Sequence, residues 1–446
     1  MKSTMKYKRL ILWFTVLFVS FGEVYAQNPI IQTNYTADAA SLVHNGRFYI
    51  YAGRDEATIT GRWYHMREWR IYSSDDMVNW TDHGPKLRPT DFSWASGDAW
   101  ASQCIFHNGK FYWYISAHHK ELKTKAIGVA VSDSPTGPFV VASEKPLITS
   151  AMSSSRGGFS EIDPTVFVDD DGQAYMYWGN GVCKYVKLNK DMISFSGEIN
   201  EVKIPRYGEA PWLQKINGSY YLSYSSNSPS TIEYVTGPTA TGPWEYKNRI
   251  LEIVENCVTS HQAITEFKGK WYLVYHNGIL PEGGSFRRSV CIDEFSFNPD
   301  GSIPMIKPTK EGVRQSVSKL NPYKRIEAET MAWSEGVKAA DDKELGVYIT
   351  EINNNDYIKV RDVDFGKGAK NFTASVSSVA NGSIELRIGS VDGRLIGTCK
   401  IEKSAGLQTW NTVSCKVQKV KNINDLYLVF KGGDGQLFNF DWWKFK

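Results

Sequence analysis

The chain has 446 residues, which is too long for one ordinary domain and predicts two. Its 51 Lys and Arg nearly balance its 48 Asp and Glu, so the overall charge excludes a strong attraction to nucleic acid or to an anionic membrane. None of its six cysteines lies in a Cys-x-x-Cys pair, which argues against a zinc cluster.

Residues 1–26 have the three parts of an export signal. A start with four Lys and Arg precedes the apolar run Leu10–Phe21, and small residues around Ala26 supply a cleavage site. A membrane anchor is the alternative, but the apolar run is short for a bilayer span. Cleavage removes those four basic residues and one acid, Glu23, and so leaves 47 of each charge. We expect a secreted or periplasmic protein that is neutral, monomeric and free of the membrane.

A repeated pattern organises about the first 300 residues. Five segments each combine an apolar strand, a tight turn containing Gly and an aromatic strand, which is the pattern of a β-hairpin. Hairpins with extra outer strands that recur about every 45 to 60 residues are typical of propeller blades. We therefore predict an all-β protein that begins with a five-bladed β-propeller over residues 27–315; a β-solenoid is the alternative, but its repeats are much shorter. The turn glycines are Gly46, Gly109, Gly172, Gly218 and Gly269.

Ionisable residues precede these hairpins at nearly the same position. Asp38 and His261 lie eight residues before their turn glycine, and Asp163 and Glu209 lie nine before theirs. Trp100 has the corresponding place in the second segment. The first strand of each blade lines the channel of a propeller, so these side chains are expected to face one cavity. A salt bridge or a turn cap explains a single buried acid, whereas three acids at equivalent positions favour a functional site.

Two carboxyl groups that face each other across a cavity suit the hydrolysis of a glycosidic bond. One must be protonated to donate to the leaving oxygen, and the other must be ionised to activate water or to attack the sugar. A third acid can raise the proton affinity of the donor, because nearby negative charge disfavours ionisation. Aromatic residues make up 13% of the chain and can stack on sugar rings, and the neutral charge fits a neutral polysaccharide.

Four motifs occur in order: NPIIQTNYTADAA, SEIDPTVFVDDDG, YGEAPWLQ and HQAITEFKGKWYLVYH. Together they resemble glycoside hydrolase family 43 over about residues 28–315. The resemblance implies Asp38 as general base, Asp163 as the residue that tunes the pKa of the acid, and Glu209 as general acid. It also implies inversion, for which the carboxyl groups of Asp38 and Glu209 are about 6.5–9.5 Å apart. The family commonly has proline where this chain has Ala39, so we expect a change in local strand geometry with the role of the acid kept.

The resemblance also points to residues around the sugar. An arginine of the family reaches the sugar, and of Arg287 and Arg288 we prefer Arg287; a surface salt bridge is the alternative. His261 matches a histidine that lies beneath the active site near a calcium ion, or else it fills the channel as a neutral side chain. Trp94 and Trp100 are candidates for the substrate-binding wall, Trp100 because of its channel position. The loops at 61–70 and 150–160 are expected to decide which linkage is cut.

Short alternating strands follow a polar linker and run from residue 321 to the end. This pattern predicts a β-sandwich (jelly-roll) domain over residues 321–446. The motifs RIEAET, NNNDYIKVRDVDFG, TWNTVSC and FNFDWWKF resemble carbohydrate-binding module family 6. The resemblance implies a structural Ca²⁺ held by Glu327, Glu329 and Asp441, whose carboxylate oxygens suit this ion.

The same resemblance implies a sugar cleft that contains Trp410 and Asn439. Glu351 occupies the position where the family often has a tyrosine. Two possibilities follow: Tyr348 takes the place of that tyrosine in the cleft, or the cleft lacks it. A purely structural sandwich is therefore the alternative to a sugar-binding module.

The sequence as a whole predicts an inverting hydrolase that releases α-L-arabinofuranosyl residues from arabinoxylan or arabinan. A β-D-xylosidase, or a dual-function enzyme acting on xylan-derived substrates, is the alternative from the same class. A catalytically inactive polysaccharide-binding protein is the alternative from another class, and the three acids argue against it. The expected partner is plant cell-wall polysaccharide (arabinoxylan, arabinan or xylan). No cofactor is expected for catalysis, so calcium is expected to be structural only.

Overall fold

The computed structural model describes residues 27–153 and 157–446, so the predicted export signal at 1–26 lies outside the described residues. Within these ranges the regular structure is β-strand, apart from one 3-10 turn at Pro89–Asp91. The prediction of an all-β protein is therefore confirmed. In the same ranges no helix is long and apolar enough to cross a membrane.

Five antiparallel sheets follow one another along residues 36–295. The first contains β1 (Thr36–His44), β2 (Arg47–Asp55), β3 (Met66–Ser74) and β4 (Trp80–Leu87). The second contains β5 (Ala95–His107), β6 (Lys110–His119), β7 (Lys125–Ser132), β8 (Val140–Val141) and β9 (Ile148–Thr149). The third contains β10 (Thr165–Val168), β11 (Ala174–Trp178), β12 (Cys183–Leu188) and β13 (Phe195–Val202). The fourth contains β14 (Tyr207–Ile216), β15 (Ser219–Ser226), β16 (Ile232–Gly237) and β17 (Glu245–Leu251), and the fifth β18 (Ala263–Phe267), β19 (Lys270–Asn277) and β20 (Ser289–Phe295).

The predicted hairpins form the first two strands of every sheet. All five turn glycines have a positive φ, between 73° and 83°. Glycine adopts this conformation without the steric cost that a side chain brings, and the tight turn fixes which residues of the two strands pair.

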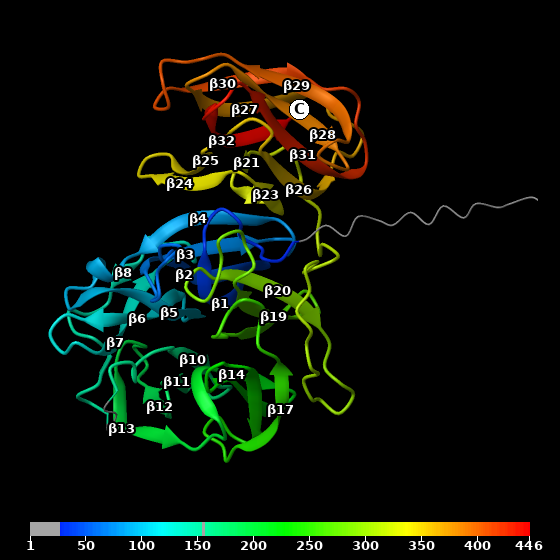
Figure 1. Cartoon of the computed structure of the whole chain (residues 1–446). Helices are drawn as coiled ribbons and strands as arrows, with labels where there is room; N and C mark the ends of the chain where they lie inside the picture. Colours follow the sequence, from blue (N-terminus) through cyan, green and yellow to red (C-terminus); the bar gives the residue numbers. More distant parts are fainter. Residues whose placement is uncertain (1–26, 154–156) are drawn as a thin grey trace, which may run out of the picture.

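The first strands of the sheets lie toward a common centre (Figure 1). β1 contacts both β5 and β18, and β10 contacts both β5 and β14. The segment before β1 joins the fifth sheet, because the amide of Ile30 donates to the carbonyl of Val290 and the amide of Thr36 donates to that of Arg288. Residues far apart in the sequence are thereby brought to one place.

Two further sheets form the C-terminal unit, drawn in yellow to red in Figure 1. Buried apolar side chains from both of them, such as Val360 and Leu428 from one and Phe372 and Trp443 from the other, share one core. One sheet contains β21 (Ile326–Glu327), β24 (Lys338–Asp342), β25 (Gly346–Thr350), β27 (Asn371–Ser378), β30 (Trp410–Lys416) and β32 (Phe438–Phe445). The other contains β23 (Trp333–Glu335), β26 (Tyr357–Asp364), β28 (Gly382–Ile388), β29 (Arg394–Ile401) and β31 (Ile423–Gly432).

The C-terminal unit adds a strand to the first sheet. β22 (Thr330–Met331) pairs antiparallel with β4, and the hydroxyl oxygens of Thr330 and Thr81 are 2.8 Å apart. Nearby, the backbone amide of Arg361 donates to Oδ1 of Asn79 at 2.8 Å, and Nδ2 of Asn79 donates to the carbonyl of Arg361 at 3.0 Å. The two parts of the chain are therefore joined by backbone as well as side-chain hydrogen bonds.

Candidate active site

A cavity of about 280 Å³ lies where the first strands of the sheets meet. The structure brings into it all five residues found by counting back from the turn glycines. They are Asp38 on β1, Trp100 on β5, Asp163 just before β10, Glu209 on β14 and His261 just before β18.

Backbone irregularities accompany the acids at this cavity. Asp38 and Asp163 have positive φ values of 54° and 61°, and Ala210, which follows Glu209, has a φ of 55°. The pairing register shifts at Asp38 in β1 and directly after Glu209 in β14. Such bulges re-aim side chains and are frequent beside active sites, and aspartate tolerates the left-handed region better than most residues.

Arg288 keeps Asp38 ionised. Its terminal nitrogens donate to Oδ1 of Asp38 at 2.8 Å and to Oδ2 at 3.2 Å, while its Nε donates to Asp55 at 2.7 Å. Burial raises the pKa of Asp38, but Arg288, His276 and His261 together outweigh burial and lower the pKa below its ordinary value. A carboxylate that stays ionised can take a proton from water.

The pKa values of Asp163 and Glu209 are shifted in the opposite direction, upward. Burial, followed by the charges of Glu209 and Asp38, raises the pKa of Asp163 well above its ordinary value. Burial also raises the pKa of Glu209, although Nδ2 of Asn180 donates to its Oε2 at 2.7 Å and favours the ionised form. The backbone N–H of Ala210 donates to Oδ2 of Asp163 at 3.0 Å, which links the two acids. The pair therefore holds a proton at a pH at which Asp38 has lost its own.

Aromatic rings form one wall of the cavity. The ring of Trp100 stacks on Phe159 with centres 5.5 Å apart, and the ring of Trp63 lies 5.7 Å from that of Phe159. Trp63 and Phe159 are 53% and 43% exposed, so part of each side chain is accessible to a ligand. Behind them, Nζ of Lys125 lies 3.3 Å from the centre of the Trp100 ring and donates to Asp98 at 2.6 Å. Exposed rings beside carboxyl groups suit stacking on a sugar.

In the C-terminal unit the two predicted cleft residues lie close together. Trp410 on β30 and Asn439 on β32 both pair with Ser377 of β27. The ring of Tyr348 lies 5.5 Å from that of Trp410 at an interplanar angle of 73°. The side chain of Asn439 is buried, and its Oδ1 accepts a hydrogen bond from the hydroxyl of Thr350 at 2.8 Å.

The three acids predicted to hold calcium are not arranged as a ligand set. Among the described residues, no group of three or more His, Cys, Asp and Glu side chains is placed to hold a metal ion. Instead, Arg325 pairs with Glu327 at 2.8 Å and with Asp441 at 3.4 Å. The chemistry of one donor does fit a cation, because Oε2 of the buried Glu329 has no hydrogen-bond partner in the described part of the chain. Burial, followed by the charge of Glu327, raises the pKa of Glu329 well above its ordinary value.

The family model for glycosyl hydrolases family 43 matches residues 26–303, and the model for carbohydrate binding module family 6 matches residues 327–446. The chain belongs to glycosyl hydrolases family 43. The resemblance drawn from the sequence motifs is therefore confirmed for both parts of the chain, and so is the prediction of a glycoside hydrolase.

Two curated enzymes are similar to this chain in sequence. The arabinoxylan arabinofuranohydrolase of Bacillus subtilis (strain 168) is 35% identical over 94% of this chain and 92% of its own length. The xylosidase/arabinosidase 43A of Humicola insolens is also 35% identical, over 63% of this chain and 99% of its own length. The crystal structure of a family 43 arabinoxylan arabinofuranohydrolase from Bacillus subtilis, in complex with cellotetraose, has a TM-score of 0.85 and 33% identity, covering 94% of this chain and 97% of that one.

Two residues predicted for the family 43 site lie elsewhere. Arg288, rather than Arg287, lines the cavity; Arg287 donates to the carbonyl of Ala57 at 2.6 Å and pairs with Glu282 at 3.4 Å. Successive side chains of an extended segment point to opposite sides, so only one of the two arginines can face Asp38.

Trp94 also lies away from the cavity. It lies just before β5, 5% exposed, with its ring stacked on His119 at a centre distance of 5.8 Å. It belongs to the core that the first and second sheets share, and only the later residues of β5, beginning with Trp100, reach the cavity.

Several residues that line the cavity were not found from the sequence, among them Trp63, Phe159 and Asn180. Trp63 and Phe159 lie in the two loops expected to shape the rim, and Asn180 lies between β11 and β12. The loops could be identified from their position between hairpins. The path of a loop has no regular period, however, so the sequence did not indicate which side chains turn inward.

Proposed function

We propose that this family 43 enzyme is an inverting α-L-arabinofuranosidase that removes arabinofuranosyl side groups from arabinoxylan or arabinan. The observation that carries the proposal is the meeting of Asp38, Asp163 and Glu209 in one cavity, with the pKa of Asp38 lowered and the other two raised. Similarity to a Bacillus subtilis arabinoxylan arabinofuranohydrolase along 94% of the chain supports the substrate class.

In the proposed reaction Asp38 is the general base and Glu209 the general acid. Asp38 takes a proton from a water molecule as the water oxygen bonds to the anomeric carbon. The bond from that carbon to the leaving oxygen breaks, and Glu209 gives its proton to that oxygen. Asp163 shares a proton with Glu209 and thereby tunes the pKa of the acid, and Arg288 orients Asp38. The reaction uses these side chains and water, and no cofactor.

The sugar is proposed to lie against the aromatic wall. Trp100 and His261 line the cavity beside the acids, and Trp63 and Phe159 add partly exposed rings to its lining. In the C-terminal unit, the contact between Tyr348 and Trp410 supports a sugar cleft at Trp410 and Asn439.

We further propose that the five sheets are the blades of a five-bladed propeller spanning residues 27–315, and that the two C-terminal sheets are a jelly-roll sandwich spanning residues 321–446. The succession of contacts from β18 through β1, β5 and β10 to β14 supports the first statement, and the shared core supports the second. Cleavage after Ala26 would deliver a monomer to the cell exterior or the periplasm, where it meets plant polysaccharide. N-terminal sequencing of the exported protein, expected to begin at Gln27, tests this step.

The variant Glu209→Gln tests the proposed reaction. It keeps the shape of the side chain and removes the proton donor, so kcat for release of arabinose from wheat arabinoxylan is expected to fall about 10²–10⁴-fold. The matched control is Glu198→Gln, at an exposed position on β13. Following the reaction by NMR shows the sugar, the linkage and the anomer that forms first.

Other results of these assays would favour a xylosidase, a retaining enzyme or an inactive binding protein. Faster turnover of p-nitrophenyl β-D-xyloside than of the α-L-arabinofuranoside would make the protein a xylosidase. A first-formed anomer with retained configuration would replace inversion by a covalent intermediate. Equal, zero turnover by the wild type and by Glu209→Gln would leave a polysaccharide-binding protein without activity.

A further inference from the structure

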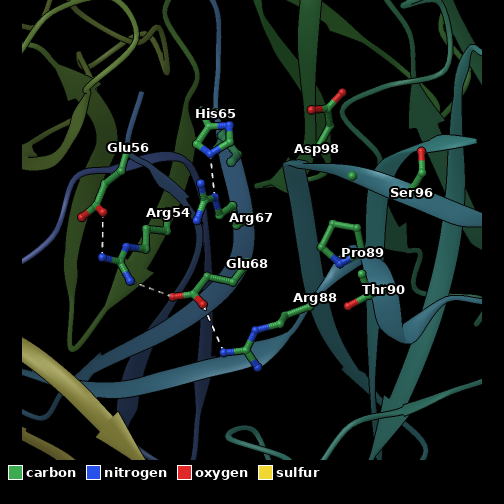
Figure 2. Close-up of a pocket in the computed structure, with 12 residues that line it drawn as sticks. Arg54, Glu56, His65, Arg67, Glu68, Arg88, Pro89, Thr90, Ser96 and Asp98 are labelled. Atoms are coloured by element: carbon green, nitrogen blue, oxygen red, sulfur yellow. Dashed lines mark hydrogen bonds and ion pairs between the residues drawn. The ribbon is translucent and has the colours of Figure 1, made fainter. Parts of the chain in front are cut away.

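A second cavity, of about 740 Å³, adjoins the active-site cavity and is shown in Figure 2. The two cavities share Met66. Around it, Tyr64 and Trp100 line the active-site cavity, while Arg67 and Asp98 line the second one. The start of β3 and the start of β5 thus form a common wall. A branched chain with one sugar between the catalytic acids can therefore place a neighbouring group in the second cavity, whose volume is typical of ligand sites.

Three arginines and three acids, Glu56, Glu68 and Asp98, line the second cavity. The arginines are Arg54, Arg67 and Arg88 (Figure 2). Glu68 pairs with three guanidinium groups, Arg70 at 2.8 Å, Arg88 at 3.3 Å and Arg54 at 3.4 Å, and Arg54 also pairs with Glu56 at 2.6 Å. Arg70 has a further carboxylate partner in Asp82 at 3.0 Å, whereas the guanidinium of Arg88 has Glu68 alone among the carboxylates of the described residues.

Arg67 and Arg88 are the least engaged of these arginines. Arg67 is exposed, its Nε donates to Nε2 of His65 at 2.6 Å, and no carboxylate of the described residues forms an ion pair with it. The side chain of Arg88 is 50% exposed and has one long ion pair, to Glu68. On the opposite wall, Asp98 is already neutralised by the buried Lys125 at 2.6 Å. With Glu56, Glu68 and Asp98 all in ion pairs, the charge that remains for a ligand is the guanidinium of Arg67, which has no carboxylate partner among the described residues.

We propose that the second cavity binds a carboxylate-bearing sugar, a uronic acid side group of the same polysaccharide that carries the arabinosyl group. This inference rests on the proposed function. The planar guanidinium group presents paired donors that match a carboxylate, whereas a neutral sugar would leave the charge of Arg67 without a partner. The favoured substrate is thus an arabinoxylan in which uronic acid groups lie near the arabinosyl groups.

The experiment compares two forms of one polymer. One is an arabinoxylan with uronic acid side groups, and the other is the same polymer after its carboxyl groups are reduced to alcohols, which removes the charge and keeps the linkages. The wild type is expected to release arabinose from the acidic form with a kcat/KM about three- to tenfold higher at low salt. The preference should shrink as salt is added, because the Debye length falls from about 30 Å at 0.01 M to about 10 Å at 0.1 M.

Variants identify the cavity as the source of the preference. Arg67→Gln is expected to lose it, and Arg88→Gln to reduce it. The control Lys190→Gln, at an exposed position between β12 and β13, should keep it. An unchanged thermal unfolding midpoint shows that each variant is folded.

The outcomes separate this inference from the proposed function. Equal kcat/KM on the two polymers by the wild type overturns the uronic acid site, because arabinose is still released. A preference that persists in both arginine variants overturns it as well, since the acid would then bind elsewhere. No release of arabinose from either polymer by the wild type contradicts the proposed function instead.

Discussion

At the scale of single residues, the chemistry of the site is set by what contacts each carboxyl group. Asp38 and Glu209 lie in the same cavity, yet their pKa values move in opposite directions. The guanidinium of Arg288 binds both oxygens of Asp38, whereas Glu209 receives one neutral hydrogen bond from Asn180. Burial therefore dominates at Glu209 and is outweighed at Asp38.

Asn180→Ala should change the pH dependence in a defined direction. The amide of Asn180 stabilises the ionised form of Glu209, so its removal raises the pKa of Glu209 further. The alkaline limb of kcat/KM, where the acid loses its proton, is expected to move to higher pH, while the acidic limb set by Asp38 stays in place. The control is Asn200→Ala, at an exposed position on β13. A shift of the alkaline limb to lower pH would contradict the assignment of Glu209 as the acid.

The sequence located these carboxyl groups but not all of their partners. The distance from a turn glycine along a strand is fixed by pairing, which is why Asp38, Asp163 and Glu209 could be found together. Arg288 has no fixed distance from a turn glycine, and its neighbour Arg287 is equally basic. Its orientation depends on Asp55 and Asp38, which lie more than two hundred residues away in the sequence.

At the scale of elements, the hairpins were the most predictable part of the fold. Each required only a local turn with a glycine at positive φ, and each formed as expected. The pairing of β22 with β4 could not be predicted in this way. It is a two-residue contact between segments about 250 positions apart, and nothing in a short strand specifies which sheet edge it will join.

Adding Ca²⁺ tests whether Glu327, Glu329 and Asp441 can bind a metal ion. A Ca²⁺ ion that draws Glu327 and Asp441 away from Arg325 would satisfy the unpartnered oxygen of Glu329. The thermal unfolding midpoint of the wild type is then expected to be higher in Ca²⁺ than in EDTA. At a Ca²⁺ concentration one hundred times Kd, binding adds about 2.7 kcal/mol to the free energy of unfolding. Glu329→Gln should lose this response.

The control for the calcium experiment is Glu344→Gln, in an exposed turn of the same unit. It should respond to Ca²⁺ as the wild type does. Identical midpoints in Ca²⁺ and EDTA for the wild type would show that Arg325, rather than a metal ion, neutralises these acids.

At the scale of the whole molecule, the two units share hydrogen bonds that a simple linker would not provide. β22 covers the outer edge of β4, and an uncovered edge strand is open to pairing with other chains. Beside it, Arg361 of β26 donates to Oε1 of Gln27 at 2.5 Å and to the carbonyls of Val313 at 3.1 Å and Arg314 at 2.7 Å. The start of the first unit, the linking segment and the second unit therefore meet at one side chain.

Arg361→Ala should uncouple the two units. The wild type is expected to unfold in one transition, because neither unit can separate without breaking the β22–β4 pair and the hydrogen bonds of Arg361. Losing these charge-assisted hydrogen bonds should lower the free energy of unfolding by about 2–4 kcal/mol, and scanning calorimetry should resolve two transitions. Arg394→Ala, at an exposed arginine of the same unit, is the control and should leave one transition. If Arg361→Ala still unfolds in one transition at the wild-type temperature, the cooperativity must come from the strand pair and from the other contacts between the units, such as the hydrogen bonds between Asn79 and the backbone of residue 361. The side chain of Arg361 would then contribute little to joining the two units.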